Sequence, residues 1–247
     1  MAYRRTERIQ ARLDATRDRI VDAAVRRIAK GGWSTVSVAG VARDASVATG
    51  TVYRHVDDKD ALLTAAFRRA ASRELEVVTV AASSDDDDPA ARLEAALRVF
   101  ADRALRGRRL AYALLAEPAG AAVEAERRIY RAGYRALFHE VLADGVADGS
   151  ILDHDAEVVA AALVGAMGEA LVGPVAPVEV TTDDSARLDE LVATCLRAVP
   201  FAHHPGSPPA TPPPPTIRSD RTTSASHPPS AETTSASHLA ARPGGTP

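Results

Sequence analysis

The 247-residue sequence predicts an all-α fold, and three observations support this prediction. Alanine, leucine, arginine and valine dominate the composition while aromatic residues make up only 4%, which favours closely packed helices over a β-sandwich or barrel. Apolar residues recur at helical spacing, as in Ile20, Ala23, Ala24 and Ile28. Glycine and proline residues separate the periodic segments. The chain is long enough for one or two domains with a sizeable core.

The charge is distributed unevenly along the chain. Residues 1–70 hold 14 Lys and Arg against 8 Asp and Glu, a net charge of +6, whereas the remainder holds 16 against 25, a net charge of −9. The overall charge of −3 conceals this asymmetry. A basic N-terminal region followed by an acidic one predicts that the first region meets a polyanion and the second does not.

Cysteine content and hydropathy indicate a reducing compartment. The single cysteine, Cys195, excludes an internal disulfide and a multi-cysteine zinc site. No apolar run near the N-terminus is typical of a signal peptide, and the uncharged run Val158–Gly168 is shorter than the roughly 20 residues that a membrane span needs. We therefore expect a cytoplasmic protein that does not enter a membrane, and we find no pattern for a metal or cofactor site.

The first element is an amphipathic helix over residues 14–30, which should end at the glycine pair 31–32. Trp33, which follows, is expected to pack into the core. Residues 1–13 form a basic arm that carries Arg4, Arg5, Arg8 and Arg12, either as a mobile segment or as an extension of the helix. The arm is either a solvated leader or a contact to DNA phosphates or the minor groove.

Two short helices follow within a region that we assign to residues 14–60. Ser37 is placed as the N-cap of a helix over 38–45, and a break at Ser46 and Val47 separates it from a third helix over 48–55. Neither short helix would be stable alone, so both must pack against the first helix. This order is the helix-turn-helix arrangement.

The third helix exposes groups that suit DNA recognition. Hydroxyl, guanidinium and imidazole groups can reach base edges and phosphates, and small residues let the backbone approach a duplex closely. The next helix begins with Lys59 behind an aspartate cap, which favours a phosphate at its N-terminus. Tyr53 has an alternative interpretation as a half-buried strut. The candidate residues of this helix are Ala48, Thr49, Gly50, Thr51, Tyr53, Arg54 and His55.

The sequence TVSVAGVARDASVATGTVYRHVDDKDALL, within residues 35–63, resembles the DNA-binding domain of the tetracycline-repressor (TetR) family. The resemblance covers residues 14–70 without a gap, and GTVYRH followed by a lysine and then ALL is its most specific part. It implies that the third helix reads the major groove, that Lys59 binds a phosphate, and that Thr35 and Ser37 lie near the DNA backbone. Two positions depart from the family pattern: Ser46 replaces the usual glycine of the turn, and Val56 replaces a phenylalanine. Ser46 must then either adopt a strained backbone or shift the turn.

The fourth helix should run from residue 58 to about 82, and the acidic run within 83–88 should form a surface loop. The remaining segments of the region 61–201 predict further helices, broken by Gly107, by residues 117–118, by the segment around Gly149 and by Gly173 with Pro174. This layout resembles the ligand-binding and dimerisation domain of the family. The predicted helices span residues 89–106, 108–115, 121–144, 155–172 and 185–199.

The resemblance implies a homodimer in which the last two helices of each subunit form a four-helix bundle. The sequence fits this arrangement, because the segment AAALVGAMGEAL is rich in small residues and the last helix carries a continuous apolar stripe. Paired DNA-binding domains can read a palindrome. The expected interface residues are Ala162, Ala166, Leu188, Leu191, Val192, Cys195, Leu196 and Val199.

The resemblance also implies a pocket for a small-molecule inducer among these helices. Each candidate lining residue has an alternative role as ordinary core, because any helical bundle needs apolar residues at this spacing. Arg131 or Arg135 would anchor an anionic ligand if it turned inward. The candidates are Leu97, Phe100, Tyr112, Leu115, Tyr130, Arg131, Tyr134, Phe138 and Met167.

Residues 202–247 are rich in Pro, Ser and Thr, and we expect this tail to be disordered. The sequence as a whole predicts a ligand-responsive transcriptional regulator, a repressor that a small-molecule inducer releases from double-stranded palindromic DNA. The alternative is an all-α small-molecule-binding protein or enzyme with a non-regulatory helix-turn-helix. The sequence shows no phosphate-binding loop, paired metal ligands or nucleophile with a base, so we expect no enzymatic activity.

Overall fold

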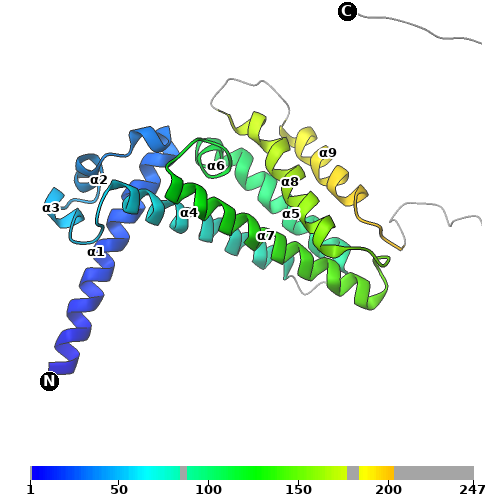
Figure 1. Ribbon diagram of the computed structural model, residues 1–247, viewed down its shortest axis with the longest axis horizontal. Helices are drawn as coiled ribbons and strands as arrows, with labels where there is room; N and C mark the ends of the chain where they lie inside the picture. The colour runs from blue at the N-terminus through cyan, green and yellow to red at the C-terminus, as the bar shows by residue number, and fades with distance from the viewer. Residues whose placement is uncertain (1, 84–87, 177–183, 203–247) are drawn as a thin grey trace, which may run out of the picture. The chain divides into compact units, whose positions relative to one another are not determined.

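The structure is a computed structural model that describes residues 2–83, 88–176 and 184–202. Residues 84–87 of the predicted loop, which hold most of its acidic run, and nearly all of the predicted disordered tail lie outside the described residues. The described part is built from helices, as the composition predicts, with one isolated β-bridge between Ile151 and Phe201. Helices α1 to α3 form what we call the head, and helices α4 to α9 form the body (Figure 1).

The head has the predicted helix-turn-helix order. It comprises α1 (Ala2–Gly31), the single 3₁₀ turn η1 (Trp33–Thr35), α2 (Val38–Asp44) and α3 (Thr49–Val52). The first helix therefore begins at Ala2 rather than near residue 14, so the basic arm is an extension of α1 and not a separate segment. Helix α3 is shorter than the predicted 48–55, but hydrogen-bonded turns continue its path, with the Val56 amide donating to the Val52 carbonyl at 3.0 Å.

Local sequence accounts for the ends of these helices. Gly32 follows α1 in the left-handed region at φ 77°, where a glycine is favoured. The Ser37 hydroxyl accepts a hydrogen bond from the Gly40 amide at 3.1 Å and so caps α2 as predicted. Ser46 has φ 56°, which confirms that this serine adopts the conformation that a glycine would adopt without strain.

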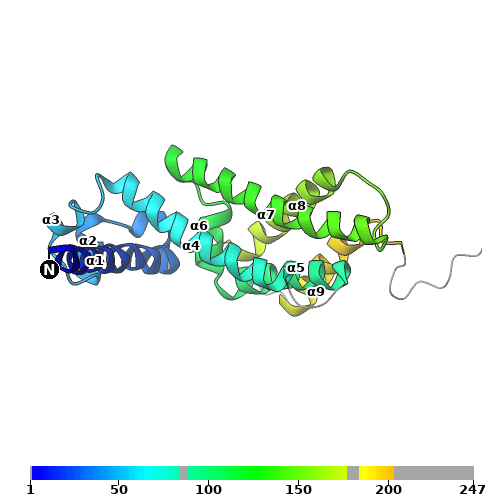
Figure 2. The same ribbon diagram turned by 90° about the horizontal axis from the view of Figure 1, so that it is seen from below.

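The body contains six helices among the described residues. Helices α4 and α7 pack along each other, and the turned view places α7 and α8 on one side of the body with α5 and α9 on the other (Figures 1 and 2). The sequence-based bounds of α5 and α6 agree with the structure. The helices are α4 (Lys59–Ala82), α5 (Pro89–Arg106), α6 (Arg108–Leu115), α7 (Ala121–Asp148), α8 (Ala156–Val175) and α9 (Asp184–Arg197).

Two of these helices are longer than predicted. Helix α7 continues past its predicted end at residue 144 and ends at the left-handed Gly149, and Gly145 within it packs closely against Ile151. Helix α8 continues through Gly173 and Pro174 to Val175. A proline so near a helix end removes only one late hydrogen bond, and the Pro174 carbonyl accepts another from Arg108 of α6.

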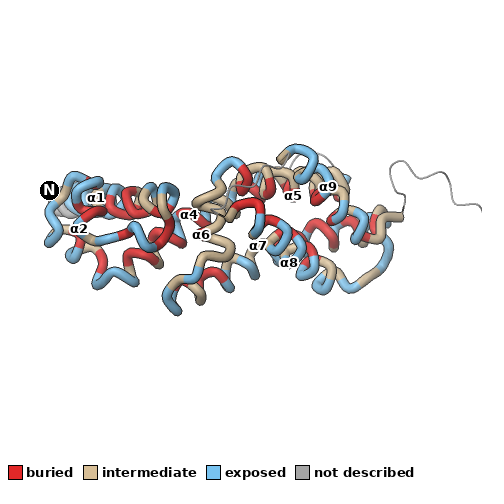
Figure 3. The backbone as a smooth tube through the Cα atoms, turned by 90° about the horizontal axis from the view of Figure 1, so that it is seen from above, coloured by how far each residue is buried: buried red, intermediate tan, exposed pale blue. Residues whose placement is uncertain are grey.

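The buried residues form two clusters, one in the head and one in the body (Figure 3). The head cluster is not confined to the head, because it includes Phe67 of α4, Ala113 of α6 and Val123 of α7. Helix α8 is long and apolar enough to cross a membrane, a criterion that the core helix of a soluble protein can also meet. Its buried residues Leu163, Met167 and Leu171 belong to the body cluster, and 33% of the apolar window is buried.

Candidate DNA-binding face and ligand cavity

Helix α3 is held in place by two buried valines and exposes its other residues. Val52 and Val56 lie in the head core, and Phe67 of α4 lies in the same cluster. Space around the Cα of Gly50 is open, with no atom within 4 Å of a Cβ placed there. The residues of this segment that face solvent fully are Ala48, Thr49, Gly50, Tyr53 and Arg54, while Thr51 and His55 are half-buried.

Tyr53 is 53% exposed, which is compatible both with a contact residue and with a half-buried strut. Lys59 is also exposed, at the first position of α4. The Asp58 side chain caps this helix by accepting from the Ala61 amide at 2.7 Å. The start of α4 thus offers a free ammonium group and the positive end of a long helix to an anion.

The hydroxyls of Thr35 and Ser37 are engaged in local structure. Thr35 Oγ1 lies 2.7 Å from the Gly32 carbonyl and 3.0 Å from the Arg27 carbonyl, and Ser37 caps α2. Arg27 also pairs with Asp44 of α2 at 2.8 Å and lowers the pKa of that carboxyl. These contacts fix α2 against α1, so the first role of Thr35 and Ser37 is to position the helix-turn-helix.

An aromatic stack connects the head core to the body. Phe67 of α4 lies between Trp33, at 6.2 Å between ring centroids, and Tyr130 of α7, at 5.7 Å. Trp33 is buried, as predicted, and its Nε1 donates to the Ala113 carbonyl of α6 at 3.2 Å. A buried indole N–H needs such an acceptor, so the contact fixes the end of the head against α6.

Helix α6 contacts the head a second time through Arg109. Its Nη2 donates to the Gly31 carbonyl at the end of α1, at 2.9 Å, and pairs with Glu117 at 2.8 Å. A Cβ on Gly32 would lie 1.5 Å from the same nitrogen, so only a glycine leaves room for this arginine. The head and α6 therefore meet through two hydrogen bonds to backbone carbonyls.

The opposite end of α6 is held by Arg127 of α7, a buried arginine. It donates to the carbonyls of Ala113, Leu114 and Glu117 at 2.9–3.1 Å and pairs with Glu124. A helix this short leaves carbonyls without partners at its C-terminus, and the guanidinium supplies donors for them. Arg127 thus positions α6.

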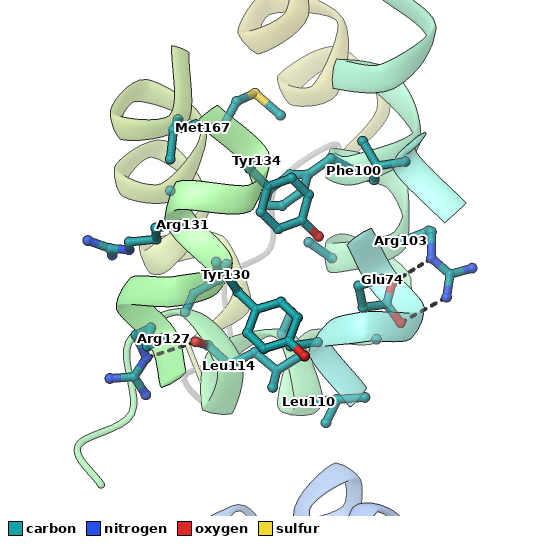
Figure 4. A pocket seen from close by; sticks show the side chains of 18 of the residues that line it. Glu74, Phe100, Arg103, Leu110, Leu114, Arg127, Tyr130, Arg131, Tyr134 and Met167 are labelled. Carbon is teal, nitrogen blue, oxygen red and sulfur yellow. Dashed lines mark hydrogen bonds and ion pairs between the residues drawn. The ribbon is translucent and has the colours of Figure 1, made fainter. Parts of the chain in front are cut away.

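A cavity of about 120 Å³ lies in the body against α6. It is mainly apolar, with polar groups contributed by α4, α5 and α7 (Figure 4). The lining residues are Phe67, Ala71, Glu74, Val78, Phe100, Arg103, Ala104, Gly107, Leu110, Ala111, Leu114, Leu115, Arg127, Tyr130, Arg131, Tyr134, Phe138, Val164, Met167 and Gly168.

Two of the predicted lining residues lie outside this cavity. Leu97 is fully buried in the body core, and the ring of Tyr112 lies beneath Arg109, at 5.7 Å from its guanidinium carbon. Helical spacing identifies apolar positions but does not tell which of them face a neighbouring helix and which face a cavity. The other candidates, which do line it, are Phe100, Leu115, Tyr130, Arg131, Tyr134, Phe138 and Met167.

The arginines considered as anion anchors are exposed. Figure 4 shows Arg131 directed away from the cavity, and Arg135 pairs with Glu157 of α8 at 3.0 Å. The charged groups at the wall are instead Glu74 and Arg103, which form a bidentate pair at 2.5 and 2.8 Å. The sequence did not single them out because charged residues on helices usually face solvent.

The apolar stripe of α9 packs within the subunit. Leu191, Val192, Cys195 and Val199 are buried in the body core. Leu188 and Leu196 are half-buried against the same core, and burial raises the pKa of the Cys195 thiol. An amphipathic helix has one apolar face, and α9 uses it mainly against α5, to which it packs. By contrast, Ala162 and Ala166 of α8 are exposed.

Comparison with known proteins identifies both regions. The profile described as "Bacterial regulatory proteins, tetR family" matches residues 20–66, and the one described as "Tetracyclin repressor-like, C-terminal domain" matches residues 86–171. Together they cover more than half of the chain. A search of curated proteins found no match.

Several solved structures share the fold. A TetR transcription regulator from Haloarcula marismortui is 23% identical, with a TM-score of 0.64, over 75% of this chain and 96% of that one. The regulator FadR from Bacillus subtilis, solved with stearoyl-CoA, is 20% identical, with a TM-score of 0.63, over 73% and 97%. RolR, solved with resorcinol, is 24% identical, with a TM-score of 0.56, over 78% and 91%. This chain belongs to the TetR family of bacterial transcriptional regulators.

Proposed function

We propose that this protein is a cytoplasmic, homodimeric repressor that a small molecule releases from a palindromic operator. In this proposal the exposed residues of α3 read bases in the major groove, and Lys59 anchors a phosphate. The exposed hydroxyl, phenol and guanidinium groups of Thr49, Tyr53 and Arg54 support this assignment.

The observation that carries the proposal is the position of α6. Leu110 and Leu114 of this helix line the cavity, while Arg109 and the carbonyl of Ala113 hold the end of α1 and Trp33. A ligand that displaces α6 must therefore displace the head or break these two hydrogen bonds. In this mechanism α6 has two positions, one that holds the head for DNA binding and one that the ligand favours. A ligand shifts the equilibrium between them only if it binds one more tightly than the other, so the ratio of its two affinities sets how far DNA affinity falls.

Helix α6 also contacts the end of α8 and the start of α9. Arg108 donates to the Pro174 carbonyl at the end of α8 and pairs with Asp184 at the start of α9. Adjacent arginines thus link one short helix to the head and to the two C-terminal helices. In a dimer built on those helices, a movement of α6 changes the position of each head relative to the partner subunit.

The proposed dimer interface keeps the α8 part of the sequence-based one. The stripe of α9 is buried within the subunit, which leaves the exposed small residues of α8, among them Ala162 and Ala166, as the better candidate surface. Small residues let two helices approach closely, and a dimer gives two heads that read two half-sites. A single monomer mass at micromolar concentration in analytical ultracentrifugation would refute the homodimer.

The relatives support a ligand in the body, since one was solved with stearoyl-CoA and another with resorcinol. The proposal is tested with the full-length protein on DNA from its own promoter and on sequences selected from a random library. Specific binding that a cavity ligand abolishes is the expected result. Absence of specific binding to any of these sequences would overturn the regulator and favour the alternative of a ligand-binding protein or enzyme.

Coupling through α6 has its own test. Arg109→Met removes both hydrogen bonds of the guanidinium but keeps much of the side-chain length, so the variant should bind ligand and operator while the ligand releases the operator less completely. Arg106→Met is the matched control, because among the described residues Arg106 pairs only with Asp102, and its side chain is largely exposed. Wild-type release by both variants would exclude Arg109 as the connection.

A further inference from the structure

Within the part of the chain that the structure describes, one hydroxyl group at the cavity wall has no hydrogen-bond partner. The two tyrosines of α7, one turn apart, differ in this respect. The hydroxyl of Tyr130 lies 2.5 Å from Ser72 Oγ and 3.2 Å from the Arg68 carbonyl. The hydroxyl of Tyr134 has no hydrogen-bond partner among the described residues, and Figure 4 shows it directed toward the side where Glu74 and Arg103 lie.

The ion pair beside this hydroxyl makes the wall polar but leaves it without excess charge. Both carboxylate oxygens of Glu74 accept from Arg103, and each keeps a lone pair that can accept another hydrogen bond. Burial, and then the charge of Glu74, raises the pKa of Tyr134, so its phenol remains protonated and can donate. The site offers a donor in Tyr134 and an acceptor in Glu74.

A charged ligand fits this wall poorly. An anion beside Tyr134 would face the carboxylate of Glu74, and the guanidinium that could balance it is already paired. Of the other arginines of the cavity, Arg127 is engaged by backbone carbonyls and Glu124, and Arg131 is directed outward. A cation would lose its hydration without an unpaired carboxylate to replace it.

The remaining walls and the volume limit the ligand further. The rings of Phe100 and Tyr134 pack edge to face, at 5.1 Å between centroids, next to aliphatic side chains of α6 and α8. A cavity of about 120 Å³ is close to the roughly 150 Å³ that accommodates benzene, and smaller than the roughly 300–1,000 Å³ of pockets for drug-sized ligands.

We propose that the ligand of this cavity is a compact neutral molecule with an apolar body about the size of one ring and a hydroxyl group, and that Tyr134 and Glu74 select that hydroxyl. The hydroxyl accepts from Tyr134 and donates to Glu74. This inference rests on the proposed function, because it assigns a ligand class to the cavity that lies against α6.

The test uses four compounds with the same tolyl body and the full-length protein at pH 7.5, measured by isothermal titration calorimetry. Toluene has no polar group, 4-methylphenol is neutral with a hydroxyl, 4-methylbenzoate is an anion and 4-methylbenzylamine is a cation. We expect 4-methylphenol to bind roughly threefold to tenfold more tightly than toluene, the contribution of one or two hydrogen bonds. The anion and the cation should bind more weakly than toluene. Tighter binding of either ion, or no binding of any of the four, would overturn the inference.

Three variants assign the selectivity to residues. Tyr134→Phe removes the donor but keeps the Glu74 acceptor, so it should lower the affinity for 4-methylphenol by roughly threefold, the contribution of one hydrogen bond, while toluene should bind as before. Tyr130→Phe, the matched control, should change neither affinity by more than about twofold, because the Tyr130 hydroxyl is already hydrogen-bonded to Ser72 and to the Arg68 carbonyl. Glu74→Gln frees Arg103 and should raise the affinity for 4-methylbenzoate by roughly tenfold or more. Equal losses in the two tyrosine variants, or no gain for the anion, would contradict the assignment.

The experiments distinguish failure of the proposed ligand class from failure of the proposed release mechanism. If 4-methylphenol binds with the expected selectivity but leaves operator affinity unchanged, the ligand class stands and the proposed release mechanism fails. If an acid or a long-chain compound releases the operator while 4-methylphenol neither binds nor acts, the regulator stands and this ligand class is wrong.

Discussion

Replacement of Ser46 by glycine should stabilise the head. Ser46 has φ 56° and an exposed side chain whose hydroxyl makes no hydrogen bond with a described residue, so the substitution removes strain without removing a contact. A non-glycine residue in the left-handed region costs roughly 1–2 kcal/mol. The greater conformational freedom of glycine in the unfolded chain offsets about 0.4–1 kcal/mol of this gain.

The net effect is a stabilisation of about 0.5–1 kcal/mol, which corresponds to a rise in Tm of roughly 1–4 °C for a chain of this size. Thermal unfolding followed by circular dichroism and calorimetry measures it. Ser46→Ala is the matched control, since alanine keeps the Cβ that causes the strain and should give no increase. Equal Tm values for the two variants would refute the argument that strain at this turn limits the stability of the head.

Three further changes test other parts of the structure. Lys59→Ala should weaken binding to every DNA sequence and reduce the salt slope by about 1, whereas Arg54→Ala should cost about 1–3 kcal/mol at particular bases, as measured by fluorescence anisotropy; equal losses on all sequences would refute this division. Gly32→Ala places a Cβ at φ 77° against a guanidinium of α6, so Tm should fall by several degrees, and an unchanged Tm would contradict the close approach. Arg68 lowers the pKa of the buried Glu126, so as pH falls the unfolded chain takes up this proton before the folded chain does. The pair therefore stabilises the fold above the unfolded pKa, near 4.5, and this stabilisation is lost as pH falls through the folded pKa. Glu126→Gln should therefore flatten the acid side of the stability profile in denaturant titrations, and an unchanged slope would contradict this assignment.

Local signals predicted the head well because they depend on neighbours in the sequence. The cap at Ser37 and the end of α1 at Gly31 each follow from the conformational preference of one residue, whereas the left-handed turn at Ser46 follows from the family resemblance, in which a glycine is usual at this position. The extension of α1 to Ala2 was left open, since a polar and basic segment is compatible with both a helix and a mobile arm.

The cavity was predicted only in part because its polar groups come from helices distant in the sequence. Glu74 and Arg103 lie on α4 and α5, and their pairing at the wall depends on how those helices pack. The α9 stripe illustrates the same limit, since spacing reveals an apolar face but not whether it meets its own chain or a partner. Leu97, at a core position of α5, was assigned to the cavity for this reason.

The central claim is that the cavity and the DNA-binding face are coupled through α6, and thermodynamic linkage gives the most direct measurement. The affinity of full-length protein for 4-methylphenol is measured by calorimetry with and without saturating operator DNA, and operator affinity is measured with and without saturating ligand. We predict that each partner weakens the other by the same factor, roughly fivefold to 150-fold. Equal ligand affinity in the presence and absence of operator would contradict the coupling.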